Sequence, residues 1–437
     1  MPLFPKHAAL FVAACLAAAS MWLYVDRILV GHQLADAAAH ERPRGNLSDL
    51  YPRWLGAREL LLHHRNPYGD EIALEIQKGY YGRALDSSRP NDPKDQQGFA
   101  YPVYVVFLLA PLIGFSFHSV QIFFHWLLLG LTAASVWLWL RALRWRLPLL
   151  ISAAVAVLTL GCVPAVQGIK LQQLSLLVGA LLAGASACVA GGFLFCGGVL
   201  LGLATIKPQL AWPLVAWLLV WAVSEWKARW RLVLGFGVVM ALLLGGSEII
   251  LPGGWRMFAE AVGKYHHYTQ NQSVLDELVP WGYAGKILAA AAVLACAVFL
   301  WKRRGEPGNT VEFGIATALI MTLAVLVVPM YAPYNQVLLL PAVLVLARGR
   351  EGFLSRGRGV RSLYLLAAFA LMWEWIASLG LSAVYFVSRE WALRGWWLPF
   401  AATFALPVLI FVLVLLEVKG RDAGKFDFDK EASQARD

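Results

Sequence analysis

Residues 8–30 read AALFVAACLAAASMWLYVDRILV, an apolar run that is interrupted only near its end by Asp26 and Arg27. A helix needs about 20 apolar residues to cross a bilayer core about 30 Å thick, so this run predicts a membrane span. A cleaved signal peptide is the alternative, but the run is longer than a usual signal core and no A-x-A site closes it. We therefore interpret it as a retained first span.

Similar runs recur along most of the 437 residues, of which 59% are apolar and only 15% charged. Soluble domains average about 45–50% apolar and about 25% charged residues, so the composition excludes a soluble enzyme. The further runs lie near 101–117, 119–140, 147–165, 174–190, 193–206, 209–224, 232–251, 282–301, 311–330, 334–347, 362–387 and 396–418. The sequence predicts an all-α polytopic membrane protein with about 12 or 13 transmembrane helices.

The net charge of +10 comes from lysines and arginines that cluster in short links between the apolar runs. This is the positive-inside pattern of membrane proteins, and it predicts no nucleic-acid partner. The clusters are Arg141/Arg144/Arg146, Lys227/Arg229/Arg231, Lys302/Arg303/Arg304, Arg348 to Arg361, and Lys419/Arg421. From Arg146 onward they are separated by even numbers of runs, so one topology places them all in the cytoplasm.

One conflict remains in this topology, because three runs precede Arg141. Either the run 101–117, which contains Pro102 and Pro111, does not cross the membrane, or the Arg141 cluster lies outside. The same topology assigns 31–99 to the outer face, and we expect this long loop to contain short helices. We treat 1–418 as one transmembrane domain with the outer loop at 31–100, and 419–437 as a disordered cytoplasmic tail.

Eleven of the 27 acidic residues lie between Asp26 and Asp95, and ten of these are in the outer loop. Asp49 precedes a predicted helix around 54–61, which places it near the mouth of the bundle. It is a candidate catalytic base, whereas a plain helix N-cap formed by Ser48 or Asp49 is the alternative. No second acid is evident beside Asp49.

Lys207 lies between two short apolar runs, where a charge is costly and usually marks a site or a buried partner. It could bind a phosphate, or its ammonium could reach the membrane interface. Gln173 lies in the link 166–173, which the topology assigns to the outer face. His266 and His267 lie in another link on that face, 252–281. Paired histidines can hold a phosphate, shuttle protons or bind a metal, although no third ligand stands at a recognisable spacing.

Three further features carry less weight. All five cysteines lie inside apolar runs without metal spacing, which is typical of packing residues. The pattern Asp427-Phe428-Asp429 lies in the polar tail, and Glu374 is a single intramembrane acid that could belong to a proton path. Because an intramembrane acid can belong to a proton path, a transporter or flippase of lipid-linked saccharides is the alternative function. A transporter should show polar residues in several spans, whereas here they concentrate in one outer loop.

Several short motifs occur in a recognisable order. They are Asp49, Asn66-Pro67-Tyr68, Phe99-Ala100-Tyr101-Pro102, Leu108 to Leu112, Gln173-x-Ser175, the glycine-rich run 197–204 before Lys207-Pro208, Asn271-Gln272-Ser273, and Tyr334 with Leu338 to Pro341. From Ala8 to about Leu416 the chain resembles glycosyltransferase family 87. These are GT-C-fold membrane transferases that include polyprenol-phosphate-mannose-dependent mannosyltransferases of bacterial envelopes.

The resemblance implies an inverting hexosyltransferase in the bacterial plasma membrane, with its active site facing outward. Its donor would be a polyprenyl-phosphate sugar, with mannose as the first candidate, and its acceptor a glycolipid or glycan. Asp49 matches the general base, and Lys207, Gln173 and His266 or His267 are candidates for the leaving phosphate, in that order. Tyr101, Asn271, Gln272 and Tyr334 are candidate substrate contacts. Membrane lipids are its surroundings, and no cofactor or metal is implied.

Overall fold

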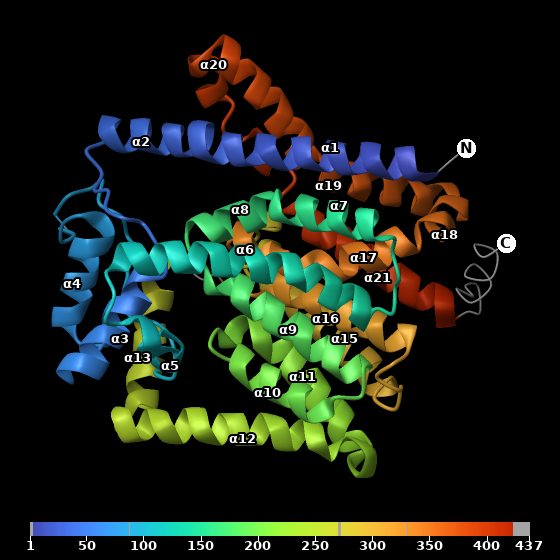
Figure 1. The fold of residues 1–437 in the computed structure, drawn as a ribbon, viewed down its shortest axis with the longest axis horizontal. Coiled ribbons are helices and arrows are strands. Elements are labelled where there is room, and N and C mark those ends of the chain that lie inside the picture. Colours follow the sequence, from blue (N-terminus) through green and yellow to red (C-terminus); the bar gives the residue numbers. More distant parts are fainter. Residues whose placement is uncertain (1–2, 87, 270–271, 330, 423–437) are drawn as a thin grey trace.

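The computed structural model describes residues 3–86, 88–269, 272–329 and 331–422, and within these ranges every regular element is a helix (Figure 1). The first membrane helix is longer than predicted. It combines α1 (Leu3–Leu23), a π-helical segment (Tyr24–Leu29) and α2 (Val30–Ala39), and from Lys6 to Ala39 it is one continuous helical segment that is apolar enough over part of its length to cross a membrane. The prediction of an all-α polytopic membrane protein is confirmed.

The loop that follows contains two short helices, as predicted, and then the run at 101–117. The helices are α3 (Tyr51–His63) and α4 (Asp70–Tyr81). The run 101–117 forms only α5 (Val105–Leu109) and one 3-10 turn, η2 (Ala110–Leu112), before α6 begins at Phe117. Neither element is long enough to cross a bilayer. The topological conflict therefore resolves in favour of a run that stays on one side.

The remaining elements form the bundle and its links. They are α6 (Phe117–Ala142), α7 (Leu149–Leu160), α8 (Val163–Lys170), α9 (Leu174–Ala190), α10 (Leu194–Ala204), α11 (Pro208–Ser224), α12 (Trp226–Ile250), α13 (Gly254–Thr269), α14 (Val274–Leu278), α15 (Ala284–Lys302), α16 (Val311–Val327), η3 (Pro333–Leu339), α17 (Leu340–Arg348), α18 (Arg350–Ser355), α19 (Arg358–Val387), α20 (Arg389–Arg394), η4 (Leu398–Phe400) and α21 (Ala405–Asp422). The Asp427-Phe428-Asp429 pattern lies outside the described residues.

In the described part of the chain, six segments are long and apolar enough to cross a membrane, fewer than the 12 or 13 spans predicted, because several apolar runs form helices of 17 residues or fewer. They are Lys6–Ala39, Phe117–Ala142, Trp226–Ile250, Ala284–Lys302, Arg358–Val387 and Arg389–Arg421. A seventh span forms if α7 and α8, which meet at 60°, are counted as one broken helix. Pro164 in the first turn of α8 cannot continue the α7 hydrogen-bond ladder, which accounts for the break. Five shorter apolar helices complete the bundle: Leu174–Ala190, Leu194–Ala204, Pro208–Ser224, Val311–Val327 and Pro333–Arg348.

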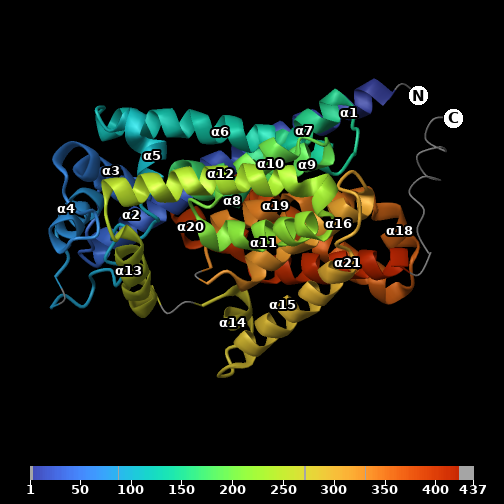
Figure 2. The same ribbon diagram turned by 90° about the horizontal axis from the view of Figure 1, so that it is seen from below.

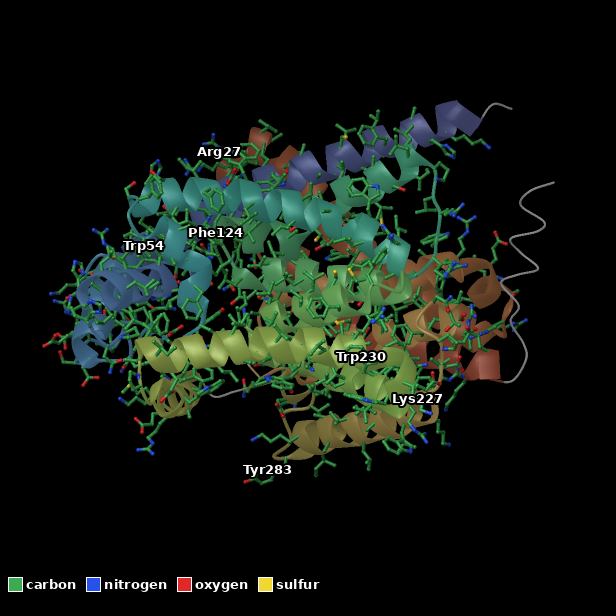
Figure 3. All side chains as sticks on the ribbon, turned by 60° about the horizontal axis from the view of Figure 1, so that its bottom comes forward. Arg27, Trp54, Phe124, Lys227, Trp230 and Tyr283 are labelled. Atoms are coloured by element: carbon green, nitrogen blue, oxygen red, sulfur yellow. The ribbon has the colours of Figure 1, made fainter. Side chains whose placement is uncertain are left out.

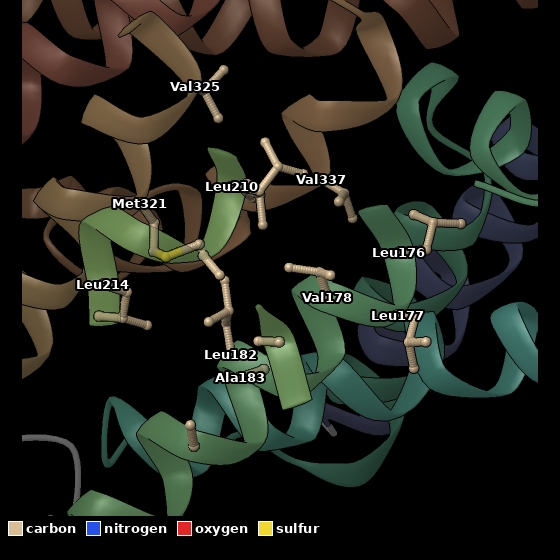
Figure 4. Close-up of a cluster of buried hydrophobic side chains, with 14 of the residues drawn as sticks. Leu176, Leu177, Val178, Leu182, Ala183, Leu210, Leu214, Met321, Val325 and Val337 are labelled. Atoms are coloured by element: carbon tan, nitrogen blue, oxygen red, sulfur yellow. The ribbon is translucent and has the colours of Figure 1, made fainter. Parts of the chain in front are cut away.

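The core of the bundle is formed by α9, α11, α16 and η3, whose side chains interlock in Figure 4. Leu182, Leu210 and Met321 are fully buried there, and α9 and α16 are apolar on almost every face. A helix that is apolar all around is one that other helices enclose. By contrast, α12 and α15 lie at the edge of the bundle and leave most of their apolar surface uncovered (Figure 2).

Helices α10 and α12 pack unusually closely because glycines line their contact. A Cβ at Gly198 of α10 would lie 2.1 Å from the carbonyl oxygen of Leu232, and one at Gly235 of α12 would lie 2.2 Å from that of Phe195. Small residues let two membrane helices approach until their backbones touch, which is the main source of attraction between helices in lipid. No larger residue fits at these two positions without moving a helix.

The basic links all meet at one end of the bundle. Arg144 donates to the carbonyl oxygen of Asn309 at 3.1 Å, Arg229 to that of Arg304 at 2.8 Å, and Arg348 to that of Leu143 at 2.9 Å. The loop helices α3 and α4 lie at the opposite end together with α13 (Figure 1). Figure 3 shows the same separation, with Trp54 of α3 far from Lys227.

Candidate active site

Asp49 lies just before α3 at the loop-bearing end of the bundle, and it does not cap that helix. The N-cap residue is Leu50, and no side chain accepts a hydrogen bond from the first turn. The Ser48 hydroxyl instead donates to Gln172 Oε1 at 2.6 Å. The alternative that Ser48 or Asp49 is a plain N-cap is therefore wrong, and the Asp49 carboxylate is available for other partners.

The Asp49 carboxylate accepts two hydrogen bonds from distant parts of the chain. Tyr80 of α4 donates its hydroxyl to Oδ1 at 3.0 Å, and Gln173 donates its amide nitrogen to Oδ2. The Asp49 backbone nitrogen also donates to the carbonyl oxygen of Leu171 at 3.0 Å. Both edges of the carboxylate are thus fixed, one by the loop and one by the bundle.

The link between α8 and α9 turns so that Gln173 can reach the Asp49 carboxylate. Gln172 adopts a left-handed backbone conformation with φ of 49°, which turns the chain sharply after Leu171. Its buried side chain holds the turn by donating to the carbonyl oxygens of Ile169 and Lys170 at 3.0 and 2.8 Å. The turn leaves Gln173 as the N-cap residue of α9, directed at Asp49.

Lys207 is buried beside the same glutamine. It precedes α11 as its N-cap residue, and its side chain donates to Gln173 Oε1 at 3.1 Å and to Ser175 Oγ at 2.6 Å. Only 6% of Lys207 is exposed, so the alternative that its ammonium reaches the membrane interface is wrong. The ammonium also lies 5.1 Å from the centre of the Tyr334 ring, within range of a cation–π interaction.

Gln173 therefore connects the Asp49 carboxylate to the Lys207 ammonium through one side chain. Its amide nitrogen donates to Asp49 and its amide oxygen accepts from Lys207. The reverse orientation would place the amide NH₂ against the ammonium and the amide oxygen against the carboxylate, so the two neighbours determine which way the amide points. The order Asp49, Gln173, Lys207 forms one continuous polar chain in a largely apolar setting.

A second cation, Arg53, lies one turn beyond Asp49 and is not among the site residues predicted from the sequence. Its guanidinium stacks over the ring of Tyr101 at 4.3 Å and donates to the Asp49 carbonyl oxygen at 2.5 Å. Among the described residues, its buried Nε atom has no hydrogen-bond partner. Tyr101 is itself held by Tyr68, whose hydroxyl donates to the Tyr101 carbonyl oxygen at 2.6 Å. The i, i+4 spacing of Asp49 and Arg53 is the signal that could have pointed to Arg53.

Asp95 is a second acid that interacts with Asp49, although no second acid was evident there from the sequence. Burial raises the pKa of Asp95, and the negative charge of Asp49 raises it further, whereas hydrogen bonds from Gln97 and the charge of Arg53 act against this. Burial and Asp49 also raise the pKa of Tyr80, so its hydroxyl remains a hydrogen-bond donor at neutral pH. The loop thus presents a group of interacting titratable side chains at this end of the bundle.

The candidates from the second half of the chain are brought together only in part. Tyr334, at the start of η3, lies beside Lys207, and Tyr265 of α13 interacts electrostatically with Arg53 and Tyr334. Gln272 is tied by its carbonyl oxygen to the backbone nitrogen of Tyr331 at 3.0 Å. Asn271 and the side chains of His266 and His267 lie outside the described part of the chain. Within that part, no three His, Cys, Asp or Glu residues form a group that could hold a metal ion.

The arrangement combines a fixed carboxylate with two cations within one network. Such a carboxylate can accept a proton from a hydroxyl group, and the cations can stabilise a negatively charged group. Two polar residues at the end of α8 and in the α8–α9 link have structural roles. Lys170 forms an ion pair with Asp26, and Gln172 accepts a hydrogen bond from Ser48.

The sequence model of glycosyltransferase family 87 matches residues 99–329, which is more than half of the chain. The matched range contains Tyr101, Gln173 and Lys207, whereas Asp49 precedes it and Tyr334 follows it. No curated protein and no solved structure matches the chain.

Proposed function

The chain belongs to glycosyltransferase family 87 and is therefore a membrane glycosyltransferase, and from that premise we propose its substrates and mechanism. It transfers a hexose, with mannose as the first candidate, from a polyprenyl-phosphate donor to a glycolipid or glycan acceptor. The transfer takes place at the outer face of a bacterial plasma membrane and inverts the configuration of the sugar. The observation that carries this proposal is the polar chain from Asp49 through Gln173 to Lys207.

Asp49 acts as the general base in this reaction. The acceptor hydroxyl attacks the anomeric carbon, a new C–O bond forms, and the proton of the hydroxyl passes to the Asp49 carboxylate. Two hydrogen bonds hold that carboxylate at both oxygens, so its position is determined before the acceptor arrives. A general base of this kind contributes about 10²- to 10⁴-fold, and the remainder must come from positioning and charge stabilisation.

The leaving group is the polyprenyl phosphate, which keeps the electron pair of the broken C–O bond and gains negative charge. Lys207 supplies a buried positive charge close to the base, and Arg53 supplies a guanidinium whose Nε has no partner among the described residues. Arginine is well suited to phosphate because its planar group offers several donors in a fixed arrangement. In this proposal both cations stabilise the departing phosphate.

The outward orientation rests on the separation of charge along the bundle. The basic links all lie at the end opposite to Asp49, and basic links are retained on the cytoplasmic side of a membrane (Figure 1). The base and both cations then face the outside. A donor carried on a lipid is consistent with that side, because the leaving group remains anchored in the membrane.

The direct test is to incubate the purified protein in lipid nanodiscs with a panel of polyprenyl-phosphate sugars and several glycolipid acceptors. We expect one donor to be consumed, with polyprenyl phosphate released and a product of opposite anomeric configuration observed by NMR. Consumption of nucleotide sugars instead, or a product that retains the donor configuration, would contradict the proposal. An Asp49→Asn variant tested in parallel shows whether any observed turnover depends on the site.

A further inference from the structure

A large cavity of about 1570 Å³ lies away from the candidate active site, between helices α1, α7, α17, α19 and α21. Its walls are apolar and include Ile151, Val155, Val343, Leu371, Leu406 and Ile410. Pockets for small ligands usually measure about 300–1,000 Å³, so this space exceeds what a small metabolite needs. The cavity extends from the basic end of the bundle to Gln336 in η3.

The mouth of the cavity is strongly basic. Five arginines contribute to its lining, against two acids; the arginines are Arg141, Arg144, Arg146, Arg348 and Arg350, and the acids are Glu351 and Glu374. Glu351 pairs with Arg350 at 3.4 Å, and Glu374 accepts a hydrogen bond from the Val163 backbone nitrogen at 3.1 Å. Neither acid therefore balances Arg141 in the last turn of α6 or Arg144 and Arg146 in the link to α7.

Two of these arginines are exposed and available. Within the described part of the chain, Arg141 and Arg146 form neither an ion pair nor a side-chain hydrogen bond, whereas Arg144 uses one nitrogen to bind the Asn309 carbonyl oxygen. By contrast, Arg229 at the same end is saturated by the carbonyl oxygens of Trp221 and of residues 304–306. Arg141 and Arg146 are thus the two basic groups at the mouth to which the described part of the chain gives no structural partner.

We propose that this cavity binds an anionic phospholipid, with the phosphate-bearing headgroup among the arginines and the acyl chains along the apolar walls. Basic pockets between membrane helices on the cytoplasmic side recognise anionic headgroups in this way. A soluble phosphorylated ligand would leave the apolar walls without a partner, and a zwitterionic lipid would leave the arginine charges uncompensated. The bound lipid also fills the space behind Gln336 and Val337 of η3, the element that carries Tyr334.

The test measures lipid binding to the full-length protein by native mass spectrometry, with dioleoyl-phosphatidylglycerol, dioleoyl-phosphatidylcholine and undecaprenyl phosphate added at equal concentrations. We expect retention of phosphatidylglycerol over phosphatidylcholine. The double variant Arg141→Gln/Arg146→Gln should bind phosphatidylglycerol about fivefold more weakly for each arginine removed. The matched control Lys227→Gln/Arg231→Gln removes two charges at the same end but outside the cavity, and it should bind as the unmodified protein does.

A third variant, Val343→Trp, tests the apolar walls without changing any charge. It fills part of the cavity and should reduce the number of retained lipids. Equal binding of the two phospholipids, or equal losses in the arginine variant and its control, would overturn the proposal. Displacement of phosphatidylglycerol by undecaprenyl phosphate would also overturn it, because the cavity would then hold an isoprenoid phosphate. The cytoplasmic placement of the arginines rests on the orientation given in the proposed function. Lipid binding is measured without sugar transfer, so failure of the lipid site and failure of the transferase proposal give different results.

Discussion

Gln173 lies between Asp49 and Lys207 and hydrogen-bonds to both: its amide nitrogen donates to the Asp49 carboxylate, and its amide oxygen accepts from the Lys207 ammonium at 3.1 Å. The three residues come from the outer loop, the α8–α9 link and the start of α11. The site therefore depends on how these three segments are held together.

The first prediction concerns Asp49→Asn. Because the amide cannot accept the proton of the acceptor hydroxyl, we expect kcat to fall by about 10²- to 10⁴-fold, with insertion into the membrane unchanged. Release of sugar from a radiolabelled polyprenyl-phosphate donor measures this. Asp70→Asn, at an exposed position in the first turn of α4, is the matched control and should keep full activity. Normal turnover in the Asp49 variant would remove it from the mechanism.

The second prediction concerns Gln173→Met. Methionine preserves the length of the side chain but makes neither hydrogen bond, so Asp49 and Lys207 lose their common partner. We expect kcat to fall by roughly tenfold to 100-fold, because displacements of about 1 Å at a reacting group have effects of this size. Gln167→Met in α8, a half-buried position in the same segment, is the control. Equal kcat values for the two variants would show that the bridge is not needed.

The third prediction separates charge from shape at Lys207. Lys207→Met should raise the donor KM by roughly tenfold to 100-fold, since a hydrogen bond to a charged group contributes about 1.5–3 kcal/mol. Lys207→Arg keeps the charge and should raise it less. The donor KM and the unfolding temperature are measured for all three proteins. Identical donor KM values in folded proteins would refute a contact between Lys207 and the phosphate.

The fourth prediction is a pH dependence that arises from Asp95. Burial raises the pKa of Asp95 in the folded protein, so its contribution to stability is full below the pKa of the unfolded chain and is lost as the pH rises through the folded value. Asp95→Asn removes this titration. The variant should therefore unfold at a higher temperature than the unmodified protein at pH 7.5, with the difference shrinking towards pH 3.5. A difference that does not change with pH would contradict the assignment.

The fifth prediction concerns the close contact between α10 and α12. Gly198→Ala places a methyl group 2.1 Å from the carbonyl oxygen of Leu232, so the helices must separate. We expect a loss of stability of about 1–3 kcal/mol, as overpacked cores show, measured by unfolding in detergent. Gly237→Ala on α12 is the matched control, because no atom lies within 4 Å of its added Cβ. Because alanine favours a helix more than glycine does, Gly237→Ala should keep or slightly raise the stability, and an equal loss in both variants would show that the contact with Leu232 is not the cause.

Much of the fold follows from the apolar runs, because the bilayer requires long apolar helices whatever their neighbours are. The length of a run did not reveal how it is divided. The run 101–117 forms only the short helix α5 and the 3-10 turn η2, and the span that contains Pro164 is broken into α7 and α8. Such breaks depend on whether neighbouring helices can pair with the backbone groups that a break leaves without hydrogen bonds. The sequence of the run itself does not contain that information.

The candidate site, like the fold, was predicted from the sequence only in part. Asp49, Gln173, Lys207, Tyr101 and Tyr334 were identified from the sequence, and the structure places them at one end of the bundle. Tyr80, Arg53 and Asp95 were not identified, since each is an ordinary residue of a polar loop until the loop folds back on itself. The distance between residues 49 and 173 along the chain gives no sign that their side chains touch.

The length of the first membrane helix bears on where the proposed acceptor would meet the site. Its 34 residues from Lys6 to Ala39 measure about 51 Å at 1.5 Å per residue, against a hydrocarbon layer of about 30 Å. Even a tilt of about 40°, near the upper limit for membrane helices, leaves it several ångströms too long for that layer. The helix therefore extends past the hydrocarbon layer, and the polar residues His32, Gln33 and Asp36 favour α2 as the part that lies among the headgroups. In the proposed reaction, a hydroxyl on a hydrated glycan would meet the site at this height while the lipid that carries the donor stays in the membrane.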